Sequence, residues 1–153
     1  MAKKQATCHA IDDRGEISLM LGGQEMVLRP SYEAIVAFET QTGKGVAELA
    51  NEAALRKLKL SEAAVIACEC IRAWGRESKS KAIEGSQVAK VAQLLMECEG
   101  GFLTACTHLS AMLVMAVTGR YDGKGKLKPA AADRKSTRLN SSHTDISRMP
   151  SSA

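Results

Sequence analysis

Five cysteines and three histidines are the side chains of this 153-residue chain best suited to metal binding or nucleophilic chemistry. Two pairs lie two residues apart, Cys68 with Cys70 and Cys106 with His108, in segments that we predict to be helical. On an α-helix, residues two apart point about 200° away from each other, so neither pair can share one metal ion. Structural zinc sites use four ligands at recurring spacings, and the sequence contains no such set. We therefore interpret these thiols as ordinary buried or half-buried side chains, and expect no metal and no other cofactor.

Sequence motifs for catalysis are also missing. Cys8 and His9 are adjacent in a polar N-terminal segment, without a second pair of ligands. The chain has no Gly-x-Ser-x-Gly, no phosphate loop ending in Gly-Lys-Ser/Thr and no His-Glu-x-x-His. The stretch Thr42–Gly45 contains two glycines and a lysine but follows no predicted buried strand, so we interpret it as the end of a helix. We expect that the protein is not an enzyme.

The charge balance argues against nucleic acid as a partner. Twenty-one Lys and Arg against 17 Asp and Glu give a net charge of +4, which is small for a protein that binds nucleic acid. A short basic connector, Arg56 to Lys59, precedes a predicted helix, as in a helix-turn-helix. That helix presents Glu62, Glu69 and several alanines, few of which could contact base edges. We therefore expect no binding to nucleic acid.

No segment of the sequence predicts a membrane span or a signal peptide. The start, Met1–Thr7, has no apolar run. The longest mostly apolar stretch, Phe102–Val117, is interrupted by polar residues and is shorter than the ~20 residues that a span needs. We expect a protein of the bacterial cytoplasm with no membrane contact.

The last segment, 133–153, has no hydrophobic period. It resembles the conceptual translation of a common sequencing-library adapter, with Asp133–His143 and Arg148–Ala153 as two fixed blocks around a variable one. We interpret the segment as non-native and disordered, and leave it out of the fold. It holds four basic and two acidic residues, so the rest of the chain carries 17 and 15. On this interpretation half of the apparent basic excess is not natural.

The remaining residues predict a mainly α fold of the α+β class. A mobile arm, 1–14, precedes two alternating strands, Glu16–Leu21 and Gln24–Arg29, which Gly22-Gly23 joins as a tight hairpin turn requires. A lone hairpin is marginally stable, so it must lie on helices. Residues 15–119 form one domain of a hairpin and about five helices in a small bundle, and 120–132 form a basic flexible tail.

Helix-forming periodicity and capping residues set the helix boundaries. Serines are the predicted N-caps of three helices, glycines end several segments, and 75–85 reads as an exposed loop. The five predicted helices run from the Ser31 cap to Gly43, from Val46 to Leu55, from the Ser61 cap to Trp74, from the Ser86 cap to about Glu99, and from Phe102 to Val117.

An adaptable apolar stripe on the last two predicted helices is the candidate partner-binding site. Methionine-rich surfaces accept varied partners because the side chain is flexible and polarisable. The alternative is that the same residues fill the core. The stripe consists of Met96, Leu109, Met112, Leu113 and Met115.

The order of motifs between Gly15 and Ala50 resembles a family of small phage tail proteins. A strand ending in Val27-Leu-Arg-Pro is followed by Ser31-Tyr-Glu-Ala-Ile-Val-Ala-Phe-Glu-Thr-Gln-Thr-Gly-Lys-Gly-Val-Ala-Glu-Leu-Ala50. This pattern is similar to proteins of the gene-transfer-agent type, described as tail assembly chaperones and sometimes as tail tube proteins. The helices of 66–74 and 88–119 are similar in layout and less specific.

The resemblance implies an assembly factor that binds the tape-measure protein, keeps it soluble while tail tube subunits polymerise around it, and then leaves. The alternative is a structural tail component, a tube or adaptor protein, that stays in the particle. Tail tube subunits are possible partners in both cases, and no small-molecule substrate is implied. The oligomeric state is open.

Overall fold

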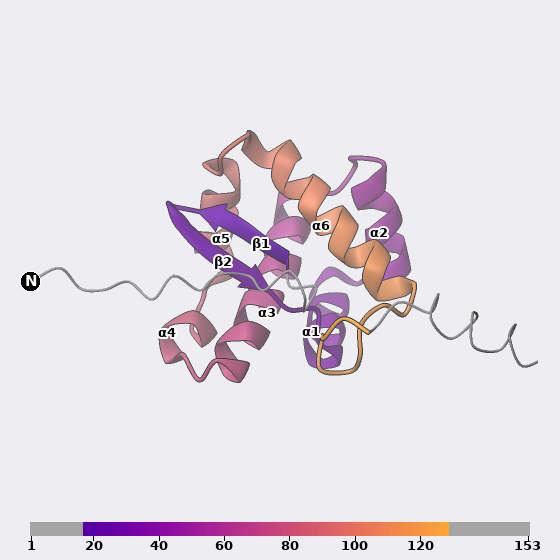
Figure 1. Cartoon of the computed structure of the whole chain (residues 1–153). Helices are drawn as coiled ribbons and strands as arrows, with labels where there is room; N and C mark the ends of the chain where they lie inside the picture. Colours follow the sequence, from indigo (N-terminus) through magenta and orange to yellow (C-terminus); the bar gives the residue numbers. More distant parts are fainter. Residues whose placement is uncertain (1–16, 129–153) are drawn as a thin grey trace, which may run out of the picture.

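The computed structural model describes residues 17–128, and Figure 1 shows their arrangement. A two-stranded antiparallel hairpin is followed by six helices, so the predicted mainly α fold with an N-terminal hairpin is confirmed. The segments 1–14, 129–132 and 133–153, for which an arm, part of a tail and an adapter translation were predicted, lie outside the described residues. The elements are β1 (Ile17–Leu21), β2 (Gln24–Leu28), α1 (Tyr32–Thr42), α2 (Val46–Ala54), α3 (Leu60–Glu77), α4 (Lys81–Glu84), α5 (Val88–Met96) and α6 (Gly101–Val117).

The hairpin forms where the alternation and the two glycines predicted it. Gly22 and Gly23 have φ of 59° and 76°, which a two-residue turn needs and which side chains with a Cβ rarely adopt. The register pairs Leu21 with Gln24 and Leu19 with Met26, so every second side chain faces the helices. Leu19 and Leu21 are buried in the core.

Helix α1 begins and ends at its predicted caps. The Ser31 hydroxyl oxygen accepts a hydrogen bond from the Ala34 amide at 3.2 Å, and Gly43 ends the helix with φ of 69°. Phe38 is completely buried. Tyr32, however, which the periodicity placed on the apolar side, is 68% exposed because it sits at the first position of the helix.

Helix α3 is the centre of the domain and contacts α1, α4, α5, α6 and β2. It starts before the predicted cap Ser61, since Lys59 is the N-cap and the Glu62 carboxylate accepts a hydrogen bond from the Lys59 amide at 3.1 Å. It also continues one turn beyond Trp74. Its alanines and cysteines are buried, which lets the neighbouring helices approach closely.

A lysine in the loop between α1 and α2 fixes the corner where these helices meet α3. The Lys44 ammonium donates to both Glu52 carboxylate oxygens, at 2.6 and 2.8 Å, and contacts Glu62 at 2.9 Å. Helix α2 lacks a side chain at its own cap, and the Glu39 carboxylate instead accepts from the Val46 amide at 2.7 Å. The Thr-Gly-Lys-Gly stretch is therefore a structural corner, as the sequence predicted for a helix end.

Glu62 makes the stability of this corner depend on pH. Burial raises the pKa of the Glu62 carboxyl, but the Lys44 ammonium and the Lys59 amide together outweigh burial and hold this pKa below its ordinary value. A lowered pKa in the folded state means that the stabilisation is present above the ordinary pKa, about 4.3, and is lost as the pH falls through the folded value.

Replacement of Glu62 by glutamine should therefore lower the free energy of unfolding by about 2 kcal/mol at pH 7. The difference from wild type should shrink as the pH is lowered through the folded pKa. Melting temperatures measured from pH 7 to pH 3 test this, with the exposed Glu99→Gln as the matched control. A constant difference across that range would show that the carboxylate charge does not stabilise the corner.

The segment 75–85, predicted as an exposed loop, contains the short helix α4 packed against α3. Gly75 makes this packing possible: a Cβ at this position would lie 2.8 Å from the Glu84 Cα and 2.9 Å from the Ile83 carbonyl carbon. The prediction of a loop was wrong. It was based on polar composition, which favours a loop, but the segment is held by close packing of α4 against Gly75 of α3.

Residues 120–128, expected to be part of a flexible tail, return to the body of the domain. Tyr121 and Leu127 form an antiparallel bridge, and Tyr121 is 7% exposed. The Arg29 Nε donates to the Lys124 carbonyl at 2.7 Å. The expectation rested on lysine and glycine content and overlooked the buried tyrosine.

No single helix in the described part of the chain is long and apolar enough to cross a membrane. Helices α5 and α6 meet that criterion only as a pair, and they are bent by 117° relative to each other.

Candidate interaction surface

Helix α6 is the largest uncharged element of the protein, since its 17 residues include no Asp, Glu, Lys or Arg. Gly100 and Gly101, with φ of 81° and 77°, turn the chain sharply from α5 into α6. The helix then crosses the molecule between the hairpin and α2 (Figure 1). A surface helix usually carries charged residues on its solvent side, and α6 has none there.

The inner face of α6 supplies much of the core and contains most of the predicted stripe. Leu109, Met112 and Leu113 are completely buried, against α2, α3 and the neighbouring elements. The prediction that these three residues form a partner-binding surface was therefore wrong, and the alternative that they fill the core is correct. Their spacing fits a core face and a binding face equally well, which is why the sequence did not separate the two.

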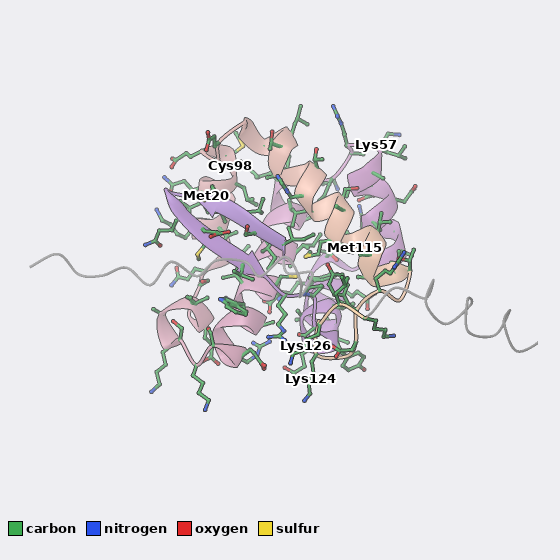
Figure 2. The ribbon with its side chains drawn as sticks, in the orientation of Figure 1. Met20, Lys57, Cys98, Met115, Lys124 and Lys126 are labelled. Atoms are coloured by element: carbon green, nitrogen blue, oxygen red, sulfur yellow. The ribbon has the colours of Figure 1, made fainter. Side chains whose placement is uncertain are left out.

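The two remaining residues of the predicted stripe do not form one surface. Met96 is 58% exposed at the end of α5, and Met115 is half-buried near the end of α6. Figure 2 shows the separation, because Met115 and Cys98, which is close to Met96 in sequence, are labelled at opposite ends of α6. Partner contact by Met96 and Met115 stays a prediction.

The outer face of α6 is apolar and faces solvent. Leu103 is 55% exposed, and Val114 and Val117 are each 42% exposed. At 100° per residue these side chains fall on one side of the helix, together with exposed Thr107 and Ala111. We call the surface formed by Leu103, Thr107, Ala111, Val114 and Val117 the α6 outer face.

The threonine hydroxyls of α6 are hydrogen-bonded to carbonyl groups of the preceding turn. Thr107 Oγ1 donates to the Leu103 carbonyl at 3.0 Å, and Thr104 Oγ1 donates to the Gly100 carbonyl at 2.8 Å. Just past the helix, Thr118 Oγ1 donates to the Val114 carbonyl at 2.8 Å. Because these hydroxyls are satisfied within the helix, a partner can cover the face without leaving their donors unpaired.

A cavity of about 260 Å³ lies beside the first half of α6, between this helix, the α5–α6 turn and β1. Its walls include Met20, Cys98, Thr104 and His108. His108, which the sequence placed in the core or at an interface, is exposed at this wall. The cavity extends the apolar surface toward the hairpin, where Met20 is 47% exposed (Figure 2).

The outer-face residues Leu103, Val114 and Val117 were missed in the sequence. The complete lack of charge over 101–117 indicates that any solvent side of this helix is uncharged, because an amphipathic surface helix would carry charged residues there, but it does not indicate which residues form that side. The methionine positions instead indicated the side of the helix that contains Met112, which is buried.

The three buried thiols, Cys68, Cys70 and Cys106, are unsuited to nucleophilic chemistry. Burial raises the pKa of Cys68, Cys70 and Cys106, so these thiols are protonated at neutral pH. Among residues 17–128, no three His, Cys, Asp or Glu side chains are placed to hold a metal ion. Cys8 and His9 lie outside this range.

A comparison with known protein families gives a match that covers most of the described chain. Residues 14–119, more than half of the chain, match the protein family described as phage tail tube protein, GTA-gp10. This stretch includes every strand and helix described above. Searches of the curated proteins and of the solved structures each gave no significant match.

Proposed function

Because the chain belongs to the phage tail tube protein family GTA-gp10, we propose that it is a structural tail component that binds tail tube subunits and is retained in the particle. The family match over 14–119 is the observation that carries this proposal. In this role the protein acts by binding and not by catalysis, and it meets its partners in the host cytoplasm, where tails assemble.

The α6 outer face supports this proposal as the contact surface. The centres of protein–protein interfaces are depleted in charged residues, and this face has none. Leu103, Val114 and Val117 together expose apolar area on a rigid helix whose other side is anchored in the core. A preformed surface of this kind loses little conformational entropy on binding.

A second candidate is a transient chaperone for the tape-measure protein, and the small strand content favours it. The only named strands in the described residues are β1 and β2, with five residues each. A subunit that forms the wall of a tube through a continuous sheet would need more strand than this. In the chaperone role, exposed Met96 and half-buried Met115 would help to contact the helical tape-measure protein.

The two functions differ in where the protein is found after assembly. The full chain, carrying an epitope tag, is co-expressed with the tail tube subunit and the tape-measure protein of the same tail gene cluster. Detection in purified particles at a fixed ratio to the tube subunit supports the structural role. Recovery with the tape-measure protein, but absence from particles, would replace it with the chaperone role.

Val114→Asp should weaken binding to the tail partner without unfolding the protein. A carboxylate in the centre of an apolar interface must be desolvated, and we expect affinity to fall about tenfold or more. Val36→Asp on α1 is a matched control, because Val36 has the same 42% exposure. Binding measured by pull-down or calorimetry should be near wild type for the control. Equal binding by both variants would exclude the α6 outer face as the contact surface.

A further inference from the structure

The turn formed by residues 120–128 concentrates positive charge in a fixed backbone. Arg120, Lys124, Lys126 and Lys128 are all exposed, and Asp122 is the only acidic residue among them. The Asp122 carboxylate accepts hydrogen bonds from the Lys124 and Lys126 amides, both at 2.9 Å. The carboxylate is therefore used to shape the turn, and the lysine ammonium groups are left to face solvent (Figure 2).

The start of α1 holds this turn in place. The Tyr32 amide donates to the Gly123 carbonyl at 3.0 Å, in addition to the bond from Arg29 to the Lys124 carbonyl. Gly125 is buried at φ of 75°, and a Cβ there would come within 2.9 Å of the Ser31 amide nitrogen. The cations are thus presented by a rigid element, which favours specific binding.

A cavity of about 340 Å³ lies between the turn, α1 and the end of α3. Arg29, Arg76 and Lys124 line it, together with Tyr32, which is 68% exposed. We call this cavity and the four cations of the turn the cationic groove. Tyrosine and arginine are the residue types most enriched among energetically dominant interface residues.

Arg76 has only a loose internal ion-pair partner, whereas Arg29 is buried and is held by its hydrogen bond to the Lys124 carbonyl. The closest approach of Arg29 to Glu77 is 3.6 Å, and that of Arg76 to Glu33 is also 3.6 Å. The two glutamate side chains are 52% and 77% exposed, so these pairs contribute little to stability. An incoming carboxylate can make shorter, charge-assisted hydrogen bonds to the accessible Arg76 guanidinium, whose side chain is 38% exposed.

We propose that the cationic groove binds an acidic segment of the tail tube subunit, with a partner carboxylate at Arg76 and further acidic residues along Lys124 and Lys126. This inference rests on the proposed function, which supplies the partner. A protein segment fits better than nucleic acid, because Glu33 and Glu77 at the rim oppose a continuous polyanion. Individual carboxylates need only the local cations.

The test is charge reversal on the turn. Lys124→Glu/Lys126→Glu in the full chain is compared with Lys57→Glu/Lys90→Glu, which changes the net charge equally at exposed sites away from the turn. Figure 2 shows Lys57 far from Lys124 and Lys126. Affinity for the purified tail tube subunit of the same gene cluster is measured by calorimetry at 50 and 300 mM NaCl. We expect the turn variant to bind at least tenfold more weakly at 50 mM, the control within about threefold of wild type, and wild-type binding to weaken with salt.

Each other outcome overturns the inference. Equal affinity of both variants for the tube subunit would exclude the groove and leave the proposed function standing. Failure of the wild type to bind any tail protein would remove the proposed function and this inference with it. A third outcome is that the wild type binds a DNA duplex in a salt-sensitive way and that only the turn variant loses this binding. If binding to the tube subunit is unchanged in that variant, the groove is a nucleic-acid site. If the turn variant melts at a lower temperature than wild type, Lys124→Gln/Lys126→Gln replaces it in the same measurements.

Discussion

Replacement of Leu109 by aspartate should leave the protein unfolded at 25 °C. Leu109 is completely buried in the core, where α6 packs against its neighbours. The substitution removes a leucine side chain and places a carboxyl group in the hydrophobic core. The combined cost is on the order of 5 kcal/mol, comparable with the whole stability of a small domain. Far-UV circular dichroism should show the loss of helix, and thermal scans should show no cooperative transition.

Val114→Asp is the internal control for this result, because it introduces the same aspartate on the solvent side of the same helix. The Val114 side chain is 42% exposed, so its carboxylate can stay hydrated and the fold should be retained. A folded Leu109→Asp protein that fails to bind partners would instead restore the predicted stripe as an interaction surface. The pair of variants thus separates the core face of α6 from its outer face.

Gly75→Ala should destabilise the protein by about 3 kcal/mol, although helix propensity alone predicts a gain of about 1 kcal/mol for this change. The new Cβ would overlap the main chain of α4 at Glu84, and main chain cannot rotate away as a flexible side chain can. Helix α4 must therefore move off α3. Urea denaturation measures the loss, and faster hydrogen exchange of the amides in Lys81–Glu84 would locate it.

Gly123→Ala serves as the control for the glycine substitution, because a Cβ at Gly123 would meet no atom within 4 Å. Its free energy of unfolding should stay within about 0.5 kcal/mol of wild type. An increase in stability for Gly75→Ala would mean that α4 adjusts to the added methyl group, and that the close contact does not hold this segment.

The parts of the fold that could be predicted are those specified by local chemistry. Two glycines in sequence define the hairpin turn, and Ser31 and Gly43 define both ends of α1. The parts that could not be predicted depend on contacts between distant residues. Gly75 looks like a helix end until α4 is seen against it, and Tyr121 looks like part of a polar tail until its burial is known.

The candidate surface was harder to predict than the fold, for a related reason. When a helix has no charged residues, its sequence does not indicate which side is buried and which side faces solvent. The methionine pattern led to Leu109, Met112 and Leu113, which the structure places in the core. Only the packing of α2 against α6 decides between the two sides.

The bond between Arg29 and Lys124 spans 95 positions of the chain, and this separation sets an order of events during synthesis. At roughly 5–20 residues per second, the ribosome needs roughly 5–20 s to add the residues between them. The hairpin and α1 can form while α6 is still untranslated. The cavity beside Tyr32 is incomplete until Gly123 and Lys124, which line it, have been synthesised. An unfinished or prematurely terminated chain therefore lacks the groove altogether. Under the proposal that the groove binds a tail partner, only molecules whose translation has passed the end of α6 can be recognised, and nascent chains are excluded from assembly.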